Sequence, residues 1–243
     1  MHPVLHQIPT PWGPLTIYTH GVCLMVGALV GWYLWVHPAP RRSRSYLIAL
    51  VAGWSGGKLL YSALHGGVIT EGGLDLAGAL LAGALAGWFS KAPRRQSAPL
   101  FPILAAFGAV GQWCHGAAFG TRFQGAPWLE RLGTYPAWEN GLGSPAWRAH
   151  LALPWTGDLP ASLPTHPVQL YEALAMLLLA FVVWRRNSIP LALLGCGAIE
   201  LSLVPLREDA MVAAAFAPVA LMLGGIALFL RQRSAGSSPA NVL

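Results

Sequence analysis

Seven long apolar runs are the feature that most constrains how this chain can fold. An apolar run of about 20 residues is long enough to cross the hydrocarbon core of a bilayer as a helix. The runs are residues 16–36, 46–64, 74–90, 100–120, 167–184, 189–206 and 211–230. We therefore predict an all-α polytopic membrane protein with seven transmembrane helices.

Composition supports a membrane location and argues against an ordinary soluble domain. Hydrophobic residues make up 55% of the chain and charged residues only 10%, whereas a soluble domain holds about 25% charged residues. The net charge of +6 comes from short basic clusters between the apolar runs. Such clusters match anionic lipid headgroups, and because they do not form one basic helical face we expect no nucleic-acid partner.

The cysteines give no sign of a metal centre. All three, Cys23, Cys114 and Cys196, lie inside apolar runs. Their spacing matches neither a metal-ligand motif nor a disulfide framework. We therefore interpret them as buried thiols and predict no metal and no cofactor.

Basic clusters follow the first, third, fifth and seventh runs, while the intervening connections are poor in lysine and arginine. The clusters are Arg41, Arg42 and Arg44; Lys91, Arg94 and Arg95; Arg185 and Arg186; and Arg231 and Arg233. Cytoplasmic connections of membrane proteins carry an excess of Lys and Arg. We therefore predict a multi-pass topology with the N-terminus outside and the C-terminus in the cytoplasm.

The longest connection, residues 121–166, is too polar to lie in lipid and is rich in Pro, Gly and Trp. It predicts a small extracytoplasmic head of irregular structure and short helices between the fourth and fifth spans. The resulting organisation is helices one to four in residues 1–120, the head in 121–166, and helices five to seven in 167–233. Residues 234–243 are rich in Ser, Ala and Pro and are predicted to be a disordered tail.

Ionisable groups within the apolar runs are candidates for function, because charges at membrane depth are costly and rare. Lys58, Glu172 and Glu200 are such groups. Gln169 and Glu172 are three residues apart, so they share one face of a helix. Lys58 is a candidate polar contact in the same pocket, or else a structural counter-ion for Glu172 or Glu200.

Arg207 stands at the outer end of the sixth run and offers a fixed positive charge. Its spacing of seven residues from Glu200 predicts that both lie on one helix face. A guanidinium matches a phosphate group bidentately, which makes Arg207 a candidate ligand for a phospholipid headgroup. The alternatives are that it pairs with Glu208 or extends to the membrane interface.

The fifth run opens with a polar heptapeptide, His166-Pro167-Val168-Gln169-Leu170-Tyr171-Glu172. This segment resembles the His-Pro-(Thr/Ser)-Gln-Leu-Tyr-Glu signature of prolipoprotein diacylglyceryl transferases. Weaker matches to the same family follow in the expected order along the chain. They are residues 13–17 with His20-Gly21, residues 56–61, 71–74, 108–120 and 206–209.

The resemblance implies an enzyme of the bacterial cytoplasmic (inner) membrane. Such enzymes move a diacylglyceryl group from phosphatidylglycerol to the cysteine thiol of a lipoprotein precursor. A cation would stabilise the departing glycerol phosphate, and a base would take the thiol proton. By this resemblance Arg207 is the catalytic cation, and the remaining candidates bind substrate. Those candidates are His166, Gln169, Tyr171, Glu172, Gln112, Gly120 and Lys58.

Several positions depart from the family pattern. One motif arginine falls on Ala109, and the histidine that usually serves as the candidate base falls on Ala77. The family's two asparagines and its glutamate fall on Gln112, His115 and Ala117; its tyrosine before Gly21 and its acid before Arg207 fall on His20 and Val204. His20 and His115 are candidates for a base supplied from new positions.

Two hypotheses therefore stand side by side. The first is a diverged diacylglyceryl transferase whose partners are phosphatidylglycerol and a lipoprotein precursor. The second is a catalytically inactive homologue that binds lipid or serves as a structural subunit with other membrane proteins. Loss of a positioned electrostatic donor costs a rate factor on the order of 10²–10³, so the departures bear directly on this choice.

Overall fold

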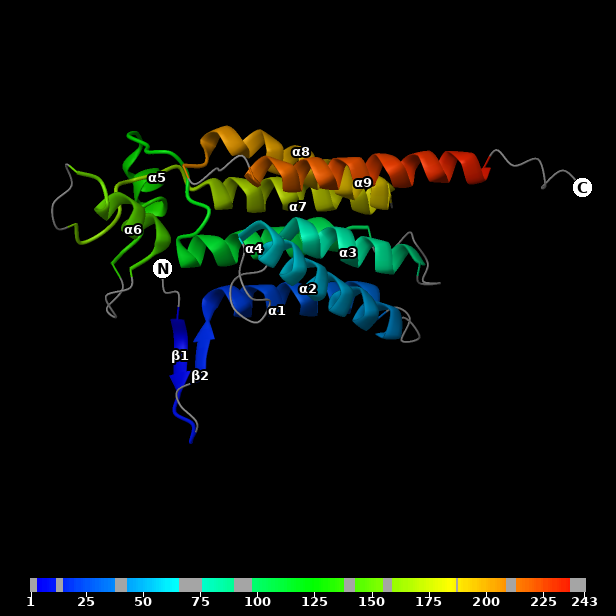
Figure 1. Cartoon of the computed structure of the whole chain (residues 1–243), viewed down its shortest axis with the longest axis horizontal. Coiled ribbons are helices and arrows are strands. Elements are labelled where there is room, and N and C mark those ends of the chain that lie inside the picture. The colour runs from blue at the N-terminus through cyan, green and yellow to red at the C-terminus, as the bar shows by residue number, and fades with distance from the viewer. Residues whose placement is uncertain are drawn as a thin grey trace, which may run out of the picture. The chain divides into compact units, whose positions relative to one another are not determined.

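The computed structural model describes residues 4–11, 15–37, 43–65, 76–89, 98–137, 143–154, 159–186, 188–208 and 213–236. Within these ranges the chain forms nine α-helices and a single two-stranded hairpin (Figure 1). The predominance of helix agrees with the prediction. Several parts of the predicted links lie outside the described residues, among them Arg41, Arg42, Lys91, Arg94, Arg95 and residues 71–74.

A helix occupies each of the seven apolar runs. These helices are α1 (Thr19–Trp35), α2 (Ser43–His65), α3 (Leu76–Phe89), α4 (Leu100–His115), α7 (Val168–Arg186), α8 (Ile189–Leu203) and α9 (Ala213–Gly236). A short 3-10 turn, η2 (Val204–Leu206), follows α8. In the described part of the chain, two helical segments are long and apolar enough to cross a bilayer, Val168–Arg186 and Ile189–Leu206. The seven-span topology and its orientation stay predictions.

The hairpin near the N-terminus is a feature that the all-α prediction missed. Strand β1 (Val4–Ile8) pairs antiparallel with β2 (Leu15–Tyr18), with Ile8 opposite Leu15. The residues of β2 include Thr, Ile and Tyr, which favour strands. As a result, α1 begins at Thr19, three residues after the start of the predicted run.

The helix in the fourth apolar run ends earlier than predicted. Helix α4 stops at His115, and Gly116 follows with a φ of +72°. A glycine with positive φ just after a helix is a common termination, because it has no Cβ to clash. Ala118 also has a positive φ, of 52°. These two residues turn the chain out of the helix, so residues 116–120 do not extend the span.

At the other end of the chain, α9 continues to Gly236, past the predicted end of the seventh run. Residues 234–236, predicted to be disordered, are therefore helical. The remainder of the predicted tail, residues 237–243, lies outside the described residues.

The described residues group into two compact units. The first comprises Met1–Val30, Leu104–Ala175 and Leu203–Met211. It holds the polar head, whose short helices are α5 (Pro127–Leu132) and α6 (Pro145–Leu151), in agreement with the short helices predicted for residues 121–166. The core of the head is formed by buried Phe119, Tyr135 and Ala146, with Trp113 of α4 packed against it.

The second unit comprises Gly31–Ile103, Met176–Ser202 and Val212–Leu243. Helices α2 and α3 pack closely in it through small residues (Figure 1). A Cβ atom placed on Gly78 would lie 2.6 Å from the carbonyl oxygen of Gly56 and 2.7 Å from Leu60 Cβ. Small residues at a membrane helix interface allow the backbones to approach in this way.

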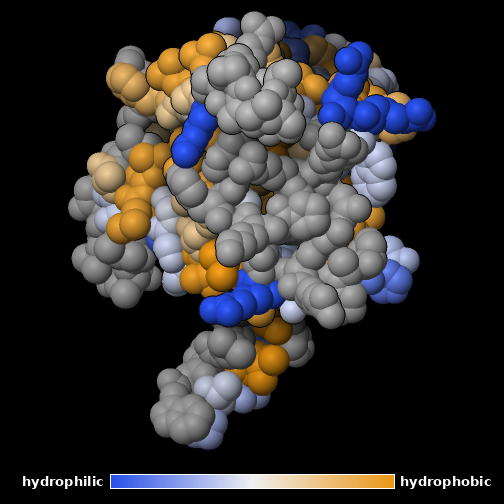
Figure 2. Space-filling model, turned by 90° about the vertical axis from the view of Figure 1, so that its right-hand side faces the viewer, coloured by the Kyte–Doolittle hydropathy of each residue, from blue (hydrophilic) through white to orange (hydrophobic). Residues whose placement is uncertain are grey.

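One side of α7 presents large apolar side chains outward. Its exposed residues are Leu174, Leu177, Leu178 and Phe181, and its buried ones are Ala173, Met176, Ala180 and Val183. Figure 2 likewise shows hydrophobic residues on the surface beside separate hydrophilic ones. Large exposed apolar faces are unusual in soluble monomers and are expected where a helix faces lipid.

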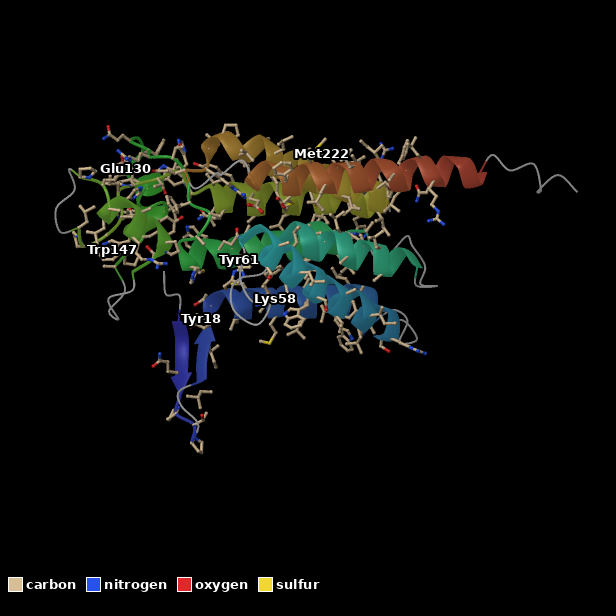
Figure 3. All side chains as sticks on the ribbon, viewed as in Figure 1. Tyr18, Lys58, Tyr61, Glu130, Trp147 and Met222 are labelled. Carbon is tan, nitrogen blue, oxygen red and sulfur yellow. The ribbon has the colours of Figure 1, made fainter. Side chains whose placement is uncertain are left out.

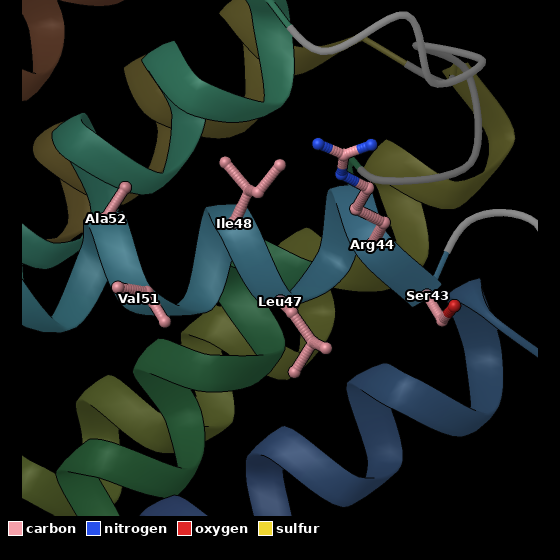
Figure 4. Close-up of a pocket in the computed structure, with 6 residues that line it drawn as sticks. All are labelled: Ser43, Arg44, Leu47, Ile48, Val51 and Ala52. Atoms are coloured by element: carbon pink, nitrogen blue, oxygen red, sulfur yellow. The ribbon is translucent and has the colours of Figure 1, made fainter.

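A shallow depression of about 570 Å³ lies along the surface of α2 (Figure 4). It is lined by Ser43, Arg44, Leu47, Ile48, Val51 and Ala52. These residues form two neighbouring rows along one helix and carry a single charged group, so we interpret the depression as part of the lipid-facing surface.

The close α2–α3 contact generates a stability prediction. Gly78→Ala should lower the free energy of unfolding by about 1–3 kcal/mol, because the added methyl must displace backbone atoms. Chemical or thermal unfolding in detergent measures the change. The matched control is Gly21→Ala in α1, where an added Cβ meets nothing within 4 Å. Equal stability of the two variants would contradict this interpretation of the interface.

Candidate functional site

The polar heptapeptide forms the junction between the head and α7. His166 and Pro167 end the extended segment, and the amides of Leu170 and Tyr171 donate to the Pro167 carbonyl at 2.9 and 3.3 Å. Gln169 and Glu172 lie in the first turns of α7 with relative exposures of 0% and 1%. The prediction that these two residues share one helix face is confirmed, and that face is buried.

Gln169 connects three parts of the first unit. Its Nε2 donates to the carbonyl of Ala117 at 2.6 Å, and its Oε1 accepts from the hydroxyl of Tyr135 at 3.1 Å. Tyr135 is itself fully buried. The amide of Gln169 is thus hydrogen-bonded at both ends to the protein, which fixes α7 against the head and the turn after α4.

Glu172 and Arg207 form a buried ion pair. Arg207 Nη2 donates to Glu172 Oε2 at 2.6 Å. The side chain of Arg207 is 13% exposed and that of Glu172 is 2% exposed. A carboxylate this deeply buried requires a cation with good geometry beside it. The cation is therefore Arg207, which pairs with Glu172 and not, as one alternative from the sequence had it, with Glu208.

Arg207 does not lie on the helix face predicted for it. Helix α8 ends at Leu203, the turn η2 contains Pro205, and Arg207 follows with an extended backbone (φ −90°, ψ 130°). Proline does not continue a regular helix. The seven-residue spacing from Glu200 therefore carries no helical periodicity, and the prediction of one shared face is wrong.

Three extended segments bring the site together. Thr121 donates its amide to Leu206 at 2.7 Å, and His166 donates its amide to Thr121 at 2.9 Å. Gly120 is bridged to Arg207 in an antiparallel arrangement. The segment around Gly120 therefore lies between the segment that carries Arg207 and the one that leads into α7.

Gly120, predicted from the family motif, has a steric role at this crossing. A Cβ atom there would lie 2.7 Å from Val168 Cγ2 and 2.8 Å from His166 Cβ, and it would also meet the His166 carbonyl. These distances are too short for any residue with a side chain unless the backbone moves.

His166 lies beside two aromatic rings. Its ring centroid is 4.5 Å from that of Phe123 and 6.3 Å from that of Tyr171. Its Nδ1 is buried and has no hydrogen-bond partner in the described part of the chain, and the same is true of Arg207 Nε. Unpartnered buried polar atoms are rare in folded proteins, so these two nitrogens retain capacity to bind a ligand.

The two histidines considered as replacement bases lie at neighbouring ends of α1 and α4. His20 packs against α4, where a Cβ on Gly111 would lie 3.1 Å from His20 Cα. His20 Nδ1 is also buried and lies against the backbone of Gly111, without a well-aligned hydrogen bond among the described residues. His115, the last residue of α4, interacts electrostatically with His20 and with Arg148.

The remaining predicted residues take other positions. Gln112 lies in α4, where its carbonyl accepts from the amide of Ala117 at 3.1 Å. Lys58 is half-buried in α2 of the second unit (Figure 3). Ala109 is fully buried in α4. Ala77 belongs to α3, but its side chain lies outside the described residues.

Four residues of this network were not identified as members of the site by the sequence analysis. They are Arg122, Tyr135, His150 and Glu208. Glu208 was considered as a partner for Arg207 and as part of the family match at residues 206–209, and the others occur in the head without a recognisable motif. Their contacts are all long-range, so no local pattern signals them.

These features define a helical membrane protein with a polar site where the head meets the first turns of α7. Among the described residues no group of three or more His, Cys, Asp or Glu is placed to hold a metal ion. The family model described as prolipoprotein diacylglyceryl transferase matches residues 7–230. The chain therefore belongs to the prolipoprotein diacylglyceryl transferase family, as the heptapeptide predicted.

A relative with a known name supports this membership. The chain is 27% identical to the phosphatidylglycerol–prolipoprotein diacylglyceryl transferase of Corynebacterium efficiens, in an alignment that covers 74% of this chain and 64% of the relative. The chain thus spans less than two thirds of the length of that relative.

The buried ion pair generates a prediction on stability. Glu172→Leu and Arg207→Met should each cost about 3–5 kcal/mol, because each leaves one charge buried without its partner. The double variant should recover a large part of that loss, since no charge remains. Unfolding in detergent measures all three variants.

The control is Arg122→Ala. Arg122 lies 3.9 Å from Glu208, with side-chain exposures of 42% and 28%, so its loss should cost less than about 1 kcal/mol. Additive losses in the Glu172–Arg207 double variant would contradict direct coupling.

Proposed function

We propose that the chain acts on phosphatidylglycerol as a diacylglyceryl transferase-like protein of the bacterial inner membrane. Its acceptor would be the cysteine thiol of a lipoprotein precursor. Family membership and the name of the relative support this proposal. The observation that carries it is the buried guanidinium of Arg207, which is oriented by Glu172 and keeps an unpartnered Nε.

The guanidinium has the donor capacity that a phosphate requires. It carries five N–H groups in a planar fork, and its hydrogen bond to Glu172 is made through Nη2. Nε therefore remains for a phosphate oxygen, and arginine–phosphate contacts of this kind are strong and directional. In this proposal Glu172 is an orienting residue and Arg207 is the group that contacts the substrate.

The reaction replaces one bond to the glyceryl carbon by another. The thiol sulfur attacks that carbon, and the bond between the carbon and the phosphate oxygen breaks. A thioether forms, and glycerol phosphate departs. Negative charge develops on the departing phosphate, where a preorganised cation stabilises the transition state. The thiol proton goes to a base, for which His20 and His115 at the ends of α1 and α4 are the candidates.

A second candidate is a protein that binds phosphatidylglycerol but does not transfer it. The observation that favours it is Ala109, which stands where the family has an arginine and has 0% exposure. A fully packed alanine supplies no cation. Loss of one such donor costs a rate factor on the order of 10²–10³. Such a protein would act as a lipid-binding or structural subunit of a membrane complex.

A transfer assay tests the first candidate. The full-length protein in nanodiscs is incubated with phosphatidylglycerol and a peptide that contains a lipobox cysteine. Mass spectrometry should show the diacylglyceryl adduct on the peptide, together with released glycerol phosphate. Arg207→Lys keeps the charge beside Glu172 but loses the planar fork, so transfer and lipid affinity should both fall by about tenfold or more.

The matched control is Arg131→Lys, at an exposed arginine of α5, which should leave transfer and binding unchanged. Lipid binding that depends on Arg207 without any peptide adduct would support the second candidate. The absence of both adduct and Arg207-dependent binding would reject the two candidates together.

A further inference from the structure

A fully buried histidine of the head is connected to the segment that carries Arg207. His150 lies in α6 with 0% exposure. Its Nε2 lies 3.5 Å from Glu208 Oε2, and Glu208 is the residue directly after Arg207. The ring of Phe119 meets the His150 ring edge-on, with centroids 5.7 Å apart. The head therefore contacts the site through an imidazole that has no access to solvent.

The hydrogen bonds assign a direction to this contact. The amide of Leu163 donates to His150 Nδ1 at 3.1 Å, so Nδ1 is the acceptor and carries no proton. The proton of the neutral ring is then on Nε2. Nε2–H consequently donates to the carboxylate of Glu208, and the histidine acts as a link between the backbone at Leu163 and the Arg207 segment.

The backbone of this segment is fixed on its other side. The amide of Glu208 donates to the carbonyl of Phe119 at 3.1 Å, and Leu206 accepts from the amide of Thr121 at 2.7 Å. Side chains of successive residues in an extended segment point in opposite directions. Arg207 accordingly contacts Glu172, while Glu208 contacts His150 and, at 3.9 Å, Arg122. A rotation of this segment about its axis would move both side chains at once.

We propose that His150 is a positioning residue that fixes the direction of the Arg207 guanidinium through Glu208. The contact with Arg122 is a weaker restraint, since both side chains are partly exposed. The buried His150 thus supplies the directional restraint. This inference rests on the proposed function insofar as Arg207 is taken to bind a lipid phosphate.

Two substitutions separate the two hydrogen bonds of His150. In His150→Gln the side-chain amide nitrogen occupies the place of Nε2 and still donates to Glu208. In His150→Asn the side-chain oxygen occupies the place of Nδ1 and still accepts from Leu163, but nothing reaches Glu208. A purely structural role would make both variants similarly defective, whereas a positioning role requires rescue by Gln alone.

The first readout is the ¹⁵Nε–¹Hε NMR signal of Arg207 in the full-length protein, identified by its loss in Arg207→Lys. The signal should shift or broaden in His150→Asn and stay in place in His150→Gln. The second readout is the affinity of short-chain phosphatidylglycerol for the protein in phosphatidylcholine nanodiscs. His150→Asn should bind about fivefold more weakly, and His150→Gln within about twofold of the wild type.

An unchanged Arg207 signal in His150→Asn, or equal changes in the two variants, would overturn the proposal. If His150→Asn does not fold, Glu208→Ala removes the same link from the exposed side and should shift the same signal. If the wild type binds phosphatidylglycerol no better than Arg207→Lys does, the proposed lipid function fails. The NMR signal alone then decides whether His150 positions Arg207.

Discussion

The ion pair between Arg207 and Glu172 is the interaction on which the rest of the first unit depends. It joins the first turns of α7 to the segment after η2, which itself is bridged to Gly120 beyond the end of α4. A carboxylate with 2% side-chain exposure is stable only beside a well-placed cation. The three extended segments that cross at Gly120 must therefore keep their register, because a shift of one residue would leave Glu172 buried without a partner. The glycine at the crossing permits this register, since any Cβ there would meet His166 and Val168.

The positions of the helices could be predicted from the sequence because apolar length is a local signal. The ends of the helices were less predictable, since other local effects decide them. Thr, Ile and Tyr favour a strand in Leu15–Tyr18, although the residues are apolar enough to belong to the first run. Gly116 and Ala118, with positive φ, end the fourth helix although the apolar character continues to residue 120. Hydropathy therefore locates a helix but does not fix where it begins or ends.

The candidate site was predictable only where helical periodicity applies. Gln169 and Glu172 share a face because both lie inside α7. The partner of Glu172 was not predictable, because helical spacing from Glu200 fails once η2 interrupts the helix before Arg207. Tyr135 and His150 reach the site through contacts that span 34 and 58 residues of the chain. Such contacts follow from the folding of the head, whose irregular segments carry no periodic pattern.

The polar atoms that stay unpartnered limit the chemistry of this site. In the described part of the first unit, the buried side-chain nitrogens without hydrogen bonds are those of His20 Nδ1, His166 Nδ1 and Arg207 Nε. The amide of Gln169 and the carboxylate of Glu172 are already bonded to protein groups. Gln169 and Glu172 therefore position other residues. The groups that can still form hydrogen bonds with a ligand are one guanidinium and two imidazoles.

A guanidinium suits a phosphate, and an imidazole suits proton transfer near neutral pH. Binding of a phospholipid headgroup needs only the guanidinium, whereas transfer needs in addition that an imidazole reach the acceptor thiol. The two candidate functions thus differ in the cation that buried Ala109 does not supply and in whether a histidine reaches the acceptor thiol.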